Sequence, residues 1–174
     1  NSGGDIHTVK FGTEKATSAL FETTFSENRA TLSPDGNWLA YESDEDGDFD
    51  VYVRPFPDVD NGKWKVSAQG GAHPVWSANG DELYFAVNDV EMAASVETDP
   101  TFSSGNPSVV FQGLYSLTDT PLFGSVDFDP NTERFVMRQR SGSAGEDSFA
   151  PLNLTAVFNW FEELSQTVPN GLGE

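Results

Sequence analysis

The sequence predicts an all-β protein made of short antiparallel strands, and three observations lead to that prediction. The chain of 174 residues contains 16 Gly and 10 Pro, a composition typical of many turns between short strands. Aromatic residues make up 13% of the chain and include 14 Phe, so an aromatic core can form although only 37% of residues are hydrophobic. The third observation is an internal repeat, which indicates how the strands are grouped.

Three copies of one pattern recur at intervals of 44 and 52 residues, over 29–41, 73–85 and 125–137. Each copy places a large apolar residue before a turn and an aromatic or β-branched strand after it. Gly36 and Gly80 suit tight hairpin turns because glycine adopts positive φ at low cost. Side-chain oxygens that can bond turn amides stand before the turns, at Ser33, Ser77 and Asp129. Repeats of this length fit a four-stranded β-propeller blade better than a helical solenoid.

The elements can be assigned in order along the chain. We expect 5–9 and 16–20 to be the last two strands of one blade. The next two blades are expected to have a first strand that ends at Leu32, followed by strands at 38–41, 50–54 and 63–67, and a first strand that ends at Trp76, followed by strands at 83–87, 91–96 and 108–111. In the final blade the strands are expected to end at Phe128, to cover 135–137 and to lie within 152–159, before a short amphipathic helix at 160–168.

The prediction is therefore a partial β-propeller of three to four blades, with four-stranded antiparallel sheets and a short C-terminal helix. It forms one domain over 1–174, with blade parts at about 5–22, 28–68, 72–112 and 123–160. A closed ring needs more blades than this, because each blade is stabilised by covering its neighbour. Two copies could therefore close one ring as a homodimer, or the missing blades could belong to a longer parent protein.

Composition excludes some classes of partner. The net charge is −19, which disfavours binding to nucleic acid and to anionic lipid. An acidic surface mostly serves solubility, and the alternative is attraction to cations or to a basic partner. No apolar run reaches the roughly 20 residues that span a bilayer, so no membrane insertion is expected in this chain. The chain has no cysteine and begins at Asn1, as expected for a processed or truncated bacterial product that is periplasmic or extracellular.

One acidic run is a candidate metal site. Asp44, Asp46, Asp48 and Asp50 alternate along 43–50, so a loop could gather several oxygens around calcium. The run lacks the bidentate Glu of an EF-hand loop, and it lies where a solvated turn between two strands is expected. The solvated turn is the favoured interpretation, and no other cofactor is predicted.

Arg29 and His73 are the candidate ligand-binding residues. They occupy equivalent positions just before the innermost strands of consecutive blades, at the end that faces the central funnel of a propeller. Two hydrogen-bond donors there could hold a carboxylate. The alternative is that they bond to acidic side chains or carbonyl groups of the protein itself.

Catalytic motifs are missing from the sequence. The two histidines, His7 and His73, do not lie in a Gly-x-Ser-x-Gly or His-Glu-x-x-His context. Carboxylate pairs are expected by chance among 28 acidic residues, so they identify no active site. We therefore expect a protein that is not an enzyme.

The residues also carry a resemblance to a known family. The run 33–41, followed by Asp50-Val-Tyr-Val53, resembles the PD40 (WD40-like) repeat of TolB-like propellers. The segments 51–57, 63–67, 70–71, 73–77 and 158–164 together resemble the C-terminal part of sensor propellers linked to bacterial membrane kinases. The chain departs from the family at Ala78 and Asn79, where Pro and Asp are usual, and in the turn at 131–133.

The resemblance implies a module that binds a protein, a peptide or a small ligand. No kinase motif lies in the chain, so no kinase activity is implied. The alternatives are a structural or sensor segment of a longer membrane kinase-type protein, and a propeller that accompanies a peptidase domain. A hydrolase domain encoded downstream, or a kinase and membrane helix encoded upstream, would separate these alternatives.

Overall fold

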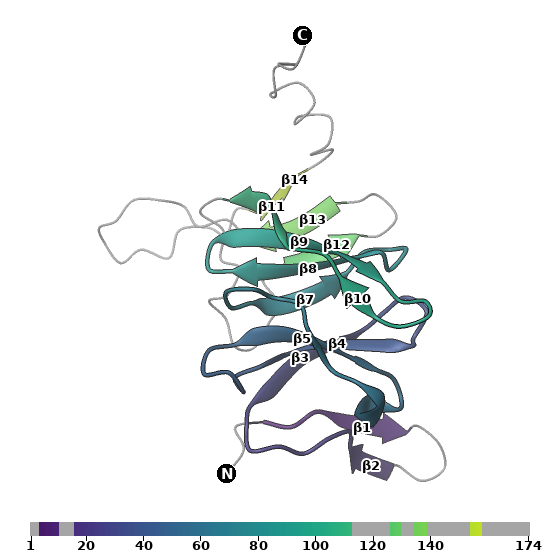
Figure 1. The fold of residues 1–174 in the computed structure, drawn as a ribbon. Helices are drawn as coiled ribbons and strands as arrows, with labels where there is room; N and C mark the ends of the chain where they lie inside the picture. The colour runs from purple at the N-terminus through teal and green to yellow at the C-terminus, as the bar shows by residue number, and fades with distance from the viewer. Residues whose placement is uncertain (1–3, 11–15, 113–125, 130–133, 139–153, 158–174) are drawn as a thin grey trace, which may run out of the picture.

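The computed structural model describes residues 4–10, 16–112, 126–129, 134–138 and 154–157, which form antiparallel sheets stacked one on the next (Figure 1). The first sheet pairs β1 (His7–Lys10) with β2 (Ala16–Ala19). The last sheet has the order β12-β13-β14 and contains β12 (Val126–Asp129), β13 (Arg134–Arg138) and β14 (Leu154–Val157). Figure 1 shows these two sheets at opposite ends of the stack.

Two larger sheets, here called blade A and blade B, lie between them. Blade A has the order β3-β4-β5-β6, from β3 (Glu27–Leu32), β4 (Trp38–Ser43), β5 (Asp50–Pro55) and β6 (Trp64–Lys65). A 3₁₀ turn at Val59–Asn61 connects β5 to β6. Blade B contains β7 (Ala72–Trp76), β8 (Glu82–Val87) and β9 (Val90–Glu97), and two strands pair with β9: β10 (Ser103–Ser104) and β11 (Ser108–Gln112).

The hairpin between the first two strands of each blade is fixed by local chemistry. In blade A the Ser33 hydroxyl accepts a hydrogen bond from the Trp38 amide at 3.0 Å, and Gly36 has φ +73°. In blade B the Ser77 hydroxyl accepts from the Glu82 amide at 2.9 Å, and Gly80 has φ +77°. The predicted roles of these serines and glycines are therefore confirmed, because both turns need a side-chain acceptor and a left-handed residue.

Apolar side chains fill the spaces between neighbouring sheets. Val51, Val53, Leu83 and Phe85 belong to the core between blades A and B, whose faces meet through alternate residues of their strands. Trp38, Trp64 and Phe102 form an aromatic group at its edge, with ring centroids 5.4 to 5.7 Å apart. Two further cores join blade A to the first sheet and blade B to the last sheet. Each sheet is thus stabilised by the next, as in a stack of propeller blades.

The all-β prediction is confirmed, and most predicted strands appear within two residues of their expected bounds. The innermost strands differ, because β3 begins at Glu27 and β7 at Ala72, so Arg29 and His73 lie inside these strands rather than before them. The short strand β10 was not expected. The predicted helix at 160–168 lies outside the described residues.

Candidate functional site

Arg29 and His73 lie at matching β-bulges in the first strands of blades A and B. The pairing of β3 with β4 shifts register between Asn28 and Thr31, and that of β7 with β8 shifts between Ala72 and Val75. Both residues have left-handed backbones, with φ +51° for Arg29 and φ +57° for His73. Such a conformation is unusual for residues other than glycine and costs about 1 kcal/mol or more. The two blades therefore repeat the same strained backbone feature at the same end.

Glu42 connects the two bulges across the interface between blades A and B. Its Oε1 lies 3.2 Å from Arg29 Nε, in an ion pair within blade A. Its Oε2 accepts a hydrogen bond of 3.0 Å from the backbone N–H of His73 in blade B. The Glu42 side chain is 7% exposed and that of Arg29 is 22% exposed, so the pair is only partly screened by water. One carboxylate thus holds the side chain of one bulge and the main chain of the other.

Burial controls the protonation of this cluster. The pKa of Glu42 is raised because burial disfavours its charge, although the His73 amide and the Arg29 guanidinium oppose the shift. The pKa of His73 is lowered to about 4, first by burial and then by the positive charge of Arg29. At neutral pH His73 is therefore uncharged, and Arg29 supplies the positive charge of the site.

These contacts affect the prediction that Arg29 and His73 bind a carboxylate group of a ligand. Arg29 pairs with Glu42, which is the intramolecular alternative considered above. Because His73 is neutral, it offers a hydrogen bond rather than a second charge. Among the described residues none is seen to bond its imidazole ring, and His73 is only 7% exposed, so a ligand could reach only a small part of it. Binding through these residues stays a prediction, and the arrangement favours a polar ligand over a strongly anionic one.

The four aspartates of the acidic run lie at the same end, and two of them, Asp46 and Asp50, meet at a lysine. Asp44 accepts from the Ser26 amide at 2.8 Å, whereas Asp46 lies 2.9 Å from Lys65 Nζ. Asp50 is buried, and its carboxylate binds Lys65 at 2.7 Å. Asp48 is exposed.

Three carboxylates of the run thus have partners within the protein, and Asp46 and Asp50 share the ammonium group of Lys65 on β6. Within the described part of the chain, no group of three or more His, Cys, Asp or Glu side chains is arranged to hold a metal ion. The calcium site stays a prediction that this arrangement does not favour. Also within the described residues, no helix has the length and apolar character needed to cross a membrane.

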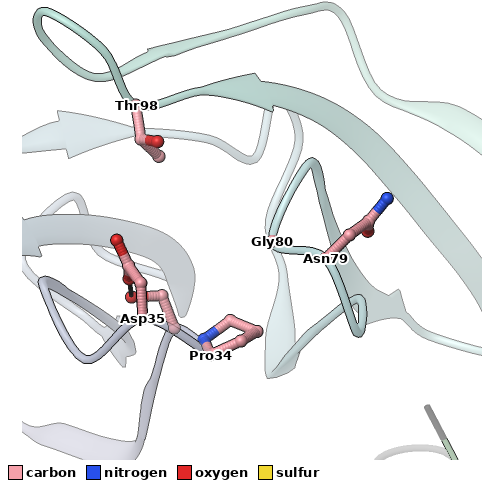
Figure 2. Close-up of a pocket in the computed structure, with 6 residues that line it drawn as sticks. Pro34, Asp35, Asn79, Gly80 and Thr98 are labelled. Atoms are coloured by element: carbon pink, nitrogen blue, oxygen red, sulfur yellow. Dashed lines mark hydrogen bonds between the residues drawn. The ribbon is translucent and has the colours of Figure 1, made fainter. Parts of the chain in front are cut away.

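The opposite end of the blades carries a small cleft of about 80 Å³. Figure 2 shows the turns of the two blades on either side of it, with Pro34 and Asp35 from blade A, Asn79 and Gly80 from blade B, and Thr98 across from them. The Asp35 carboxylate accepts hydrogen bonds from Asn37 at 2.8 and 3.1 Å, and Asn79 donates to Asp81 at 2.7 Å. These polar groups stabilise their own turns, so we favour the bulge end as the candidate site.

Sequence reasoning missed Glu42, although it organises the site. It stands in the strand 38–43 beside aromatic residues, and its amide partner His73 lies 31 positions away. A signal was present, because Glu42 is a charged residue in a strand whose neighbours on both sides are apolar or small. A charge in such a strand indicates a buried partner.

No protein-family model matches this chain, and no curated protein sequence is similar to it. Among solved structures, an oligogalacturonate lyase from Vibrio parahaemolyticus aligns over 77% of this chain and 36% of its own, with 14% identity and a TM-score of 0.52. TolB from Acinetobacter baumannii aligns over 73% of this chain and 30% of its own, with 19% identity and a TM-score of 0.47. The chain thus spans about a third of the lyase, which is itself a propeller. Together with the stacked antiparallel sheets, the lyase alignment shows the fold: this chain is part of a β-propeller.

Proposed function

We propose that this chain is a non-catalytic binding module that takes a peptide, a loop of a protein partner or a small polar ligand. The ligand contacts the bulge end of blades A and B through Arg29 and the small part of His73 that is exposed. Glu42 orients both residues without contacting the ligand. A short extended peptide fits this chemistry, because its carbonyl groups accept hydrogen bonds from a guanidinium and from a neutral imidazole.

The observation that carries the proposal is the repeated left-handed bulge. Two non-glycine residues adopt positive φ at equivalent positions of consecutive blades, with φ +51° and φ +57°. Backbone strain of this kind persists where the surrounding structure enforces it, and it is concentrated at functional sites. Here the enforcing contact is the carboxylate of Glu42, which bonds to both bulges.

The absence of catalysis is part of the proposal. With a pKa of about 4, His73 is a weak base, whereas general bases work best with a pKa near the operating pH. The lyase named above is an enzyme, but a likeness at 14% identity extends to the fold and not to its activity.

Selection from a phage-displayed library of random peptides on the immobilised chain tests the proposal. The affinity of a selected peptide would then be measured by fluorescence polarisation for the wild type, Arg29→Gln and His73→Gln. We expect both variants to weaken binding by at least about fivefold, because each loses a direct contact. Asn79→Ala, at the opposite end, serves as the matched control. Equal affinity of all four proteins would contradict the proposal.

A second candidate role is that of a structural or sensor segment within a longer TolB-like, PD40-type protein outside the cytoplasm. It is favoured by the alignment, which covers 36% of the lyase, and by the number of strands among the described residues, two in the first sheet and three in the last. In this role, further blades would belong either to a longer parent or to a second copy that closes the ring. Light scattering during size-exclusion chromatography separates these cases, because a self-closing ring elutes as a dimer and a segment of a longer chain as a monomer.

A further inference from the structure

Glu91 is a carboxylic acid buried inside an apolar interface. It lies on β9, and its residue is 1% exposed. Because alternate residues of a strand share a face, Glu91 lies on the same side of β9 as Ala93. Ala93 belongs to the apolar core between blade B and the last sheet, together with Tyr84, Val110 and Phe135. The carboxyl group therefore faces the last sheet.

The same position in blade A shows what is unusual here. In blade A the row across β3, β4 and β5 contains Asn28, Glu42 and Val51, and in blade B the matching row contains Ala72, Ala86 and Glu91. The acidic residue of this row is therefore on the second strand in blade A and on the third strand in blade B.

The two acids differ in how they are satisfied. Glu42 has an ion pair and an amide donor. In contrast, Glu91 Oε2 is fully buried and receives no hydrogen bond from the described residues. A buried carboxylate without such partners is costly, whereas its neutral form is tolerated.

Burial is the one cause of the pKa shift of Glu91, and no ion pair joins Glu91 to another described residue. Tyr84 on β8 directs its hydroxyl to Glu82, at 2.6 Å. On β11, Phe111 is the residue opposite Glu91. His73 lies on β7, which β8 separates from β9, and its pKa of about 4 keeps it neutral. In the last sheet the sequence of β12 includes Asp127 and Asp129, and that of β13 includes Arg134 and Arg138; Asp129 and Arg134 each have an interaction of their own. The pKa of Glu91 is raised to about 8, and burial is the cause.

We propose that Glu91 makes the interface between blade B and the last sheet a proton-dependent joint. In the closed interface Glu91 is neutral, and its ionisation favours separation of the last sheet, which lets water reach the carboxylate. The closed state binds a proton that the open state releases, so opening becomes easier as the pH rises. The effect starts above the ordinary pKa of 4.5 and is complete above a pH of about 8. The joint regulates the blade stack and is independent of the proposed ligand site.

Hydrogen–deuterium exchange across a pH series, corrected for intrinsic exchange rates, tests this joint. In the wild type we expect the opening constant of β11, β12 and β13 to rise about tenfold per pH unit up to about pH 8 and then to level off. Glu91→Gln should remove that slope, and Glu91→Val should do the same, since valine occupies the matching position in blade A. Glu97→Gln, an exposed change on the same strand, should behave as the wild type.

A direct titration completes the test. Carbon-13 NMR of the Glu91 side-chain carboxyl group reports its protonation in the intact chain. A pKa near that of an exposed glutamate would overturn the proposal, as would a slope in Glu91→Gln equal to that of the wild type. A raised pKa together with a slope confined to the wild type and Glu97→Gln would support it.

Discussion

A double-mutant cycle on Glu42 and Arg29 examines the contact that organises the site. The perturbations are Glu42→Gln, Arg29→Gln and the double variant. Glutamine keeps a carbonyl oxygen that can still accept the His73 amide, so the cycle isolates the charge interaction between the two side chains. The matched control is the cycle on Glu45 and Lys63, an ion pair on the same blade.

The expected magnitude follows from distance and exposure. Two charges 3.2 Å apart attract by about 5 kcal/mol at an effective dielectric constant of about 20. The raised pKa of Glu42 shows that burial offsets much of this attraction. We therefore expect a coupling free energy of about 1–3 kcal/mol. For Glu45 and Lys63 we expect about 0.5 kcal/mol, because the Lys63 side chain is 36% exposed.

Urea unfolding followed by tryptophan fluorescence measures the free energy of unfolding of each variant. The m-value must stay constant across the cycle for the comparison to hold. A coupling for Glu42 and Arg29 no larger than that for Glu45 and Lys63 would refute the view that this pair is a strong constraint on the bulge. The coupling free energy of Glu42 and Arg29 should also change little between low and high salt, since a buried pair is screened less than an exposed one.

Three further predictions concern stability. Gly71→Ala should lower the free energy of unfolding by about 1–3 kcal/mol, because its Cβ would lie 2.9–3.1 Å from Ser67, Phe85 and Val51; an unchanged urea midpoint would contradict this. Gly36→Ala should cost about 1 kcal/mol through its φ of +73°, since its Cβ would meet nothing within 4 Å; Gly36→Asn should cost less in the same assay. Because burial favours neutral His73, the free energy of unfolding of the protein should fall by about 3 kcal/mol as the pH falls from about 6.5 to about 4. Urea titrations of His73→Gln should not show this loss.

Local signals in the sequence predicted the hairpins well. Ser33 and Ser77 each accept a hydrogen bond from an amide five residues later, so both partners lie within one short stretch of sequence. The positive φ at Gly36 and Gly80 follows from the same short pattern. Because each blade repeats this pattern, the blade spacing and the all-β class could be predicted as well.

Contacts between blades could not be predicted from local patterns. The partner of Glu42 is a main-chain amide in another blade, and any amide can fill that role whatever its side chain. The acidic run was predicted from local residues alone, but Lys63 and Lys65, at and beside β6, pair with Glu45, Asp46 and Asp50 and so compete with any metal ion. Glu91 could have been noticed as a lone acid between apolar positions, but its burial depends on the sheet that covers it.

The most direct measurement of the central claim is hydrogen–deuterium exchange of the chain with and without a phage-selected peptide. The account predicts new protection at the bulge end, in the segments 26–29 and 67–73, where Arg29 and His73 lie. It predicts no change in the hairpin turns at 34–37 and 78–81, which are at the other end of the blades. Protection of these turns, with the segments 26–29 and 67–73 unchanged, would contradict the assignment of the site.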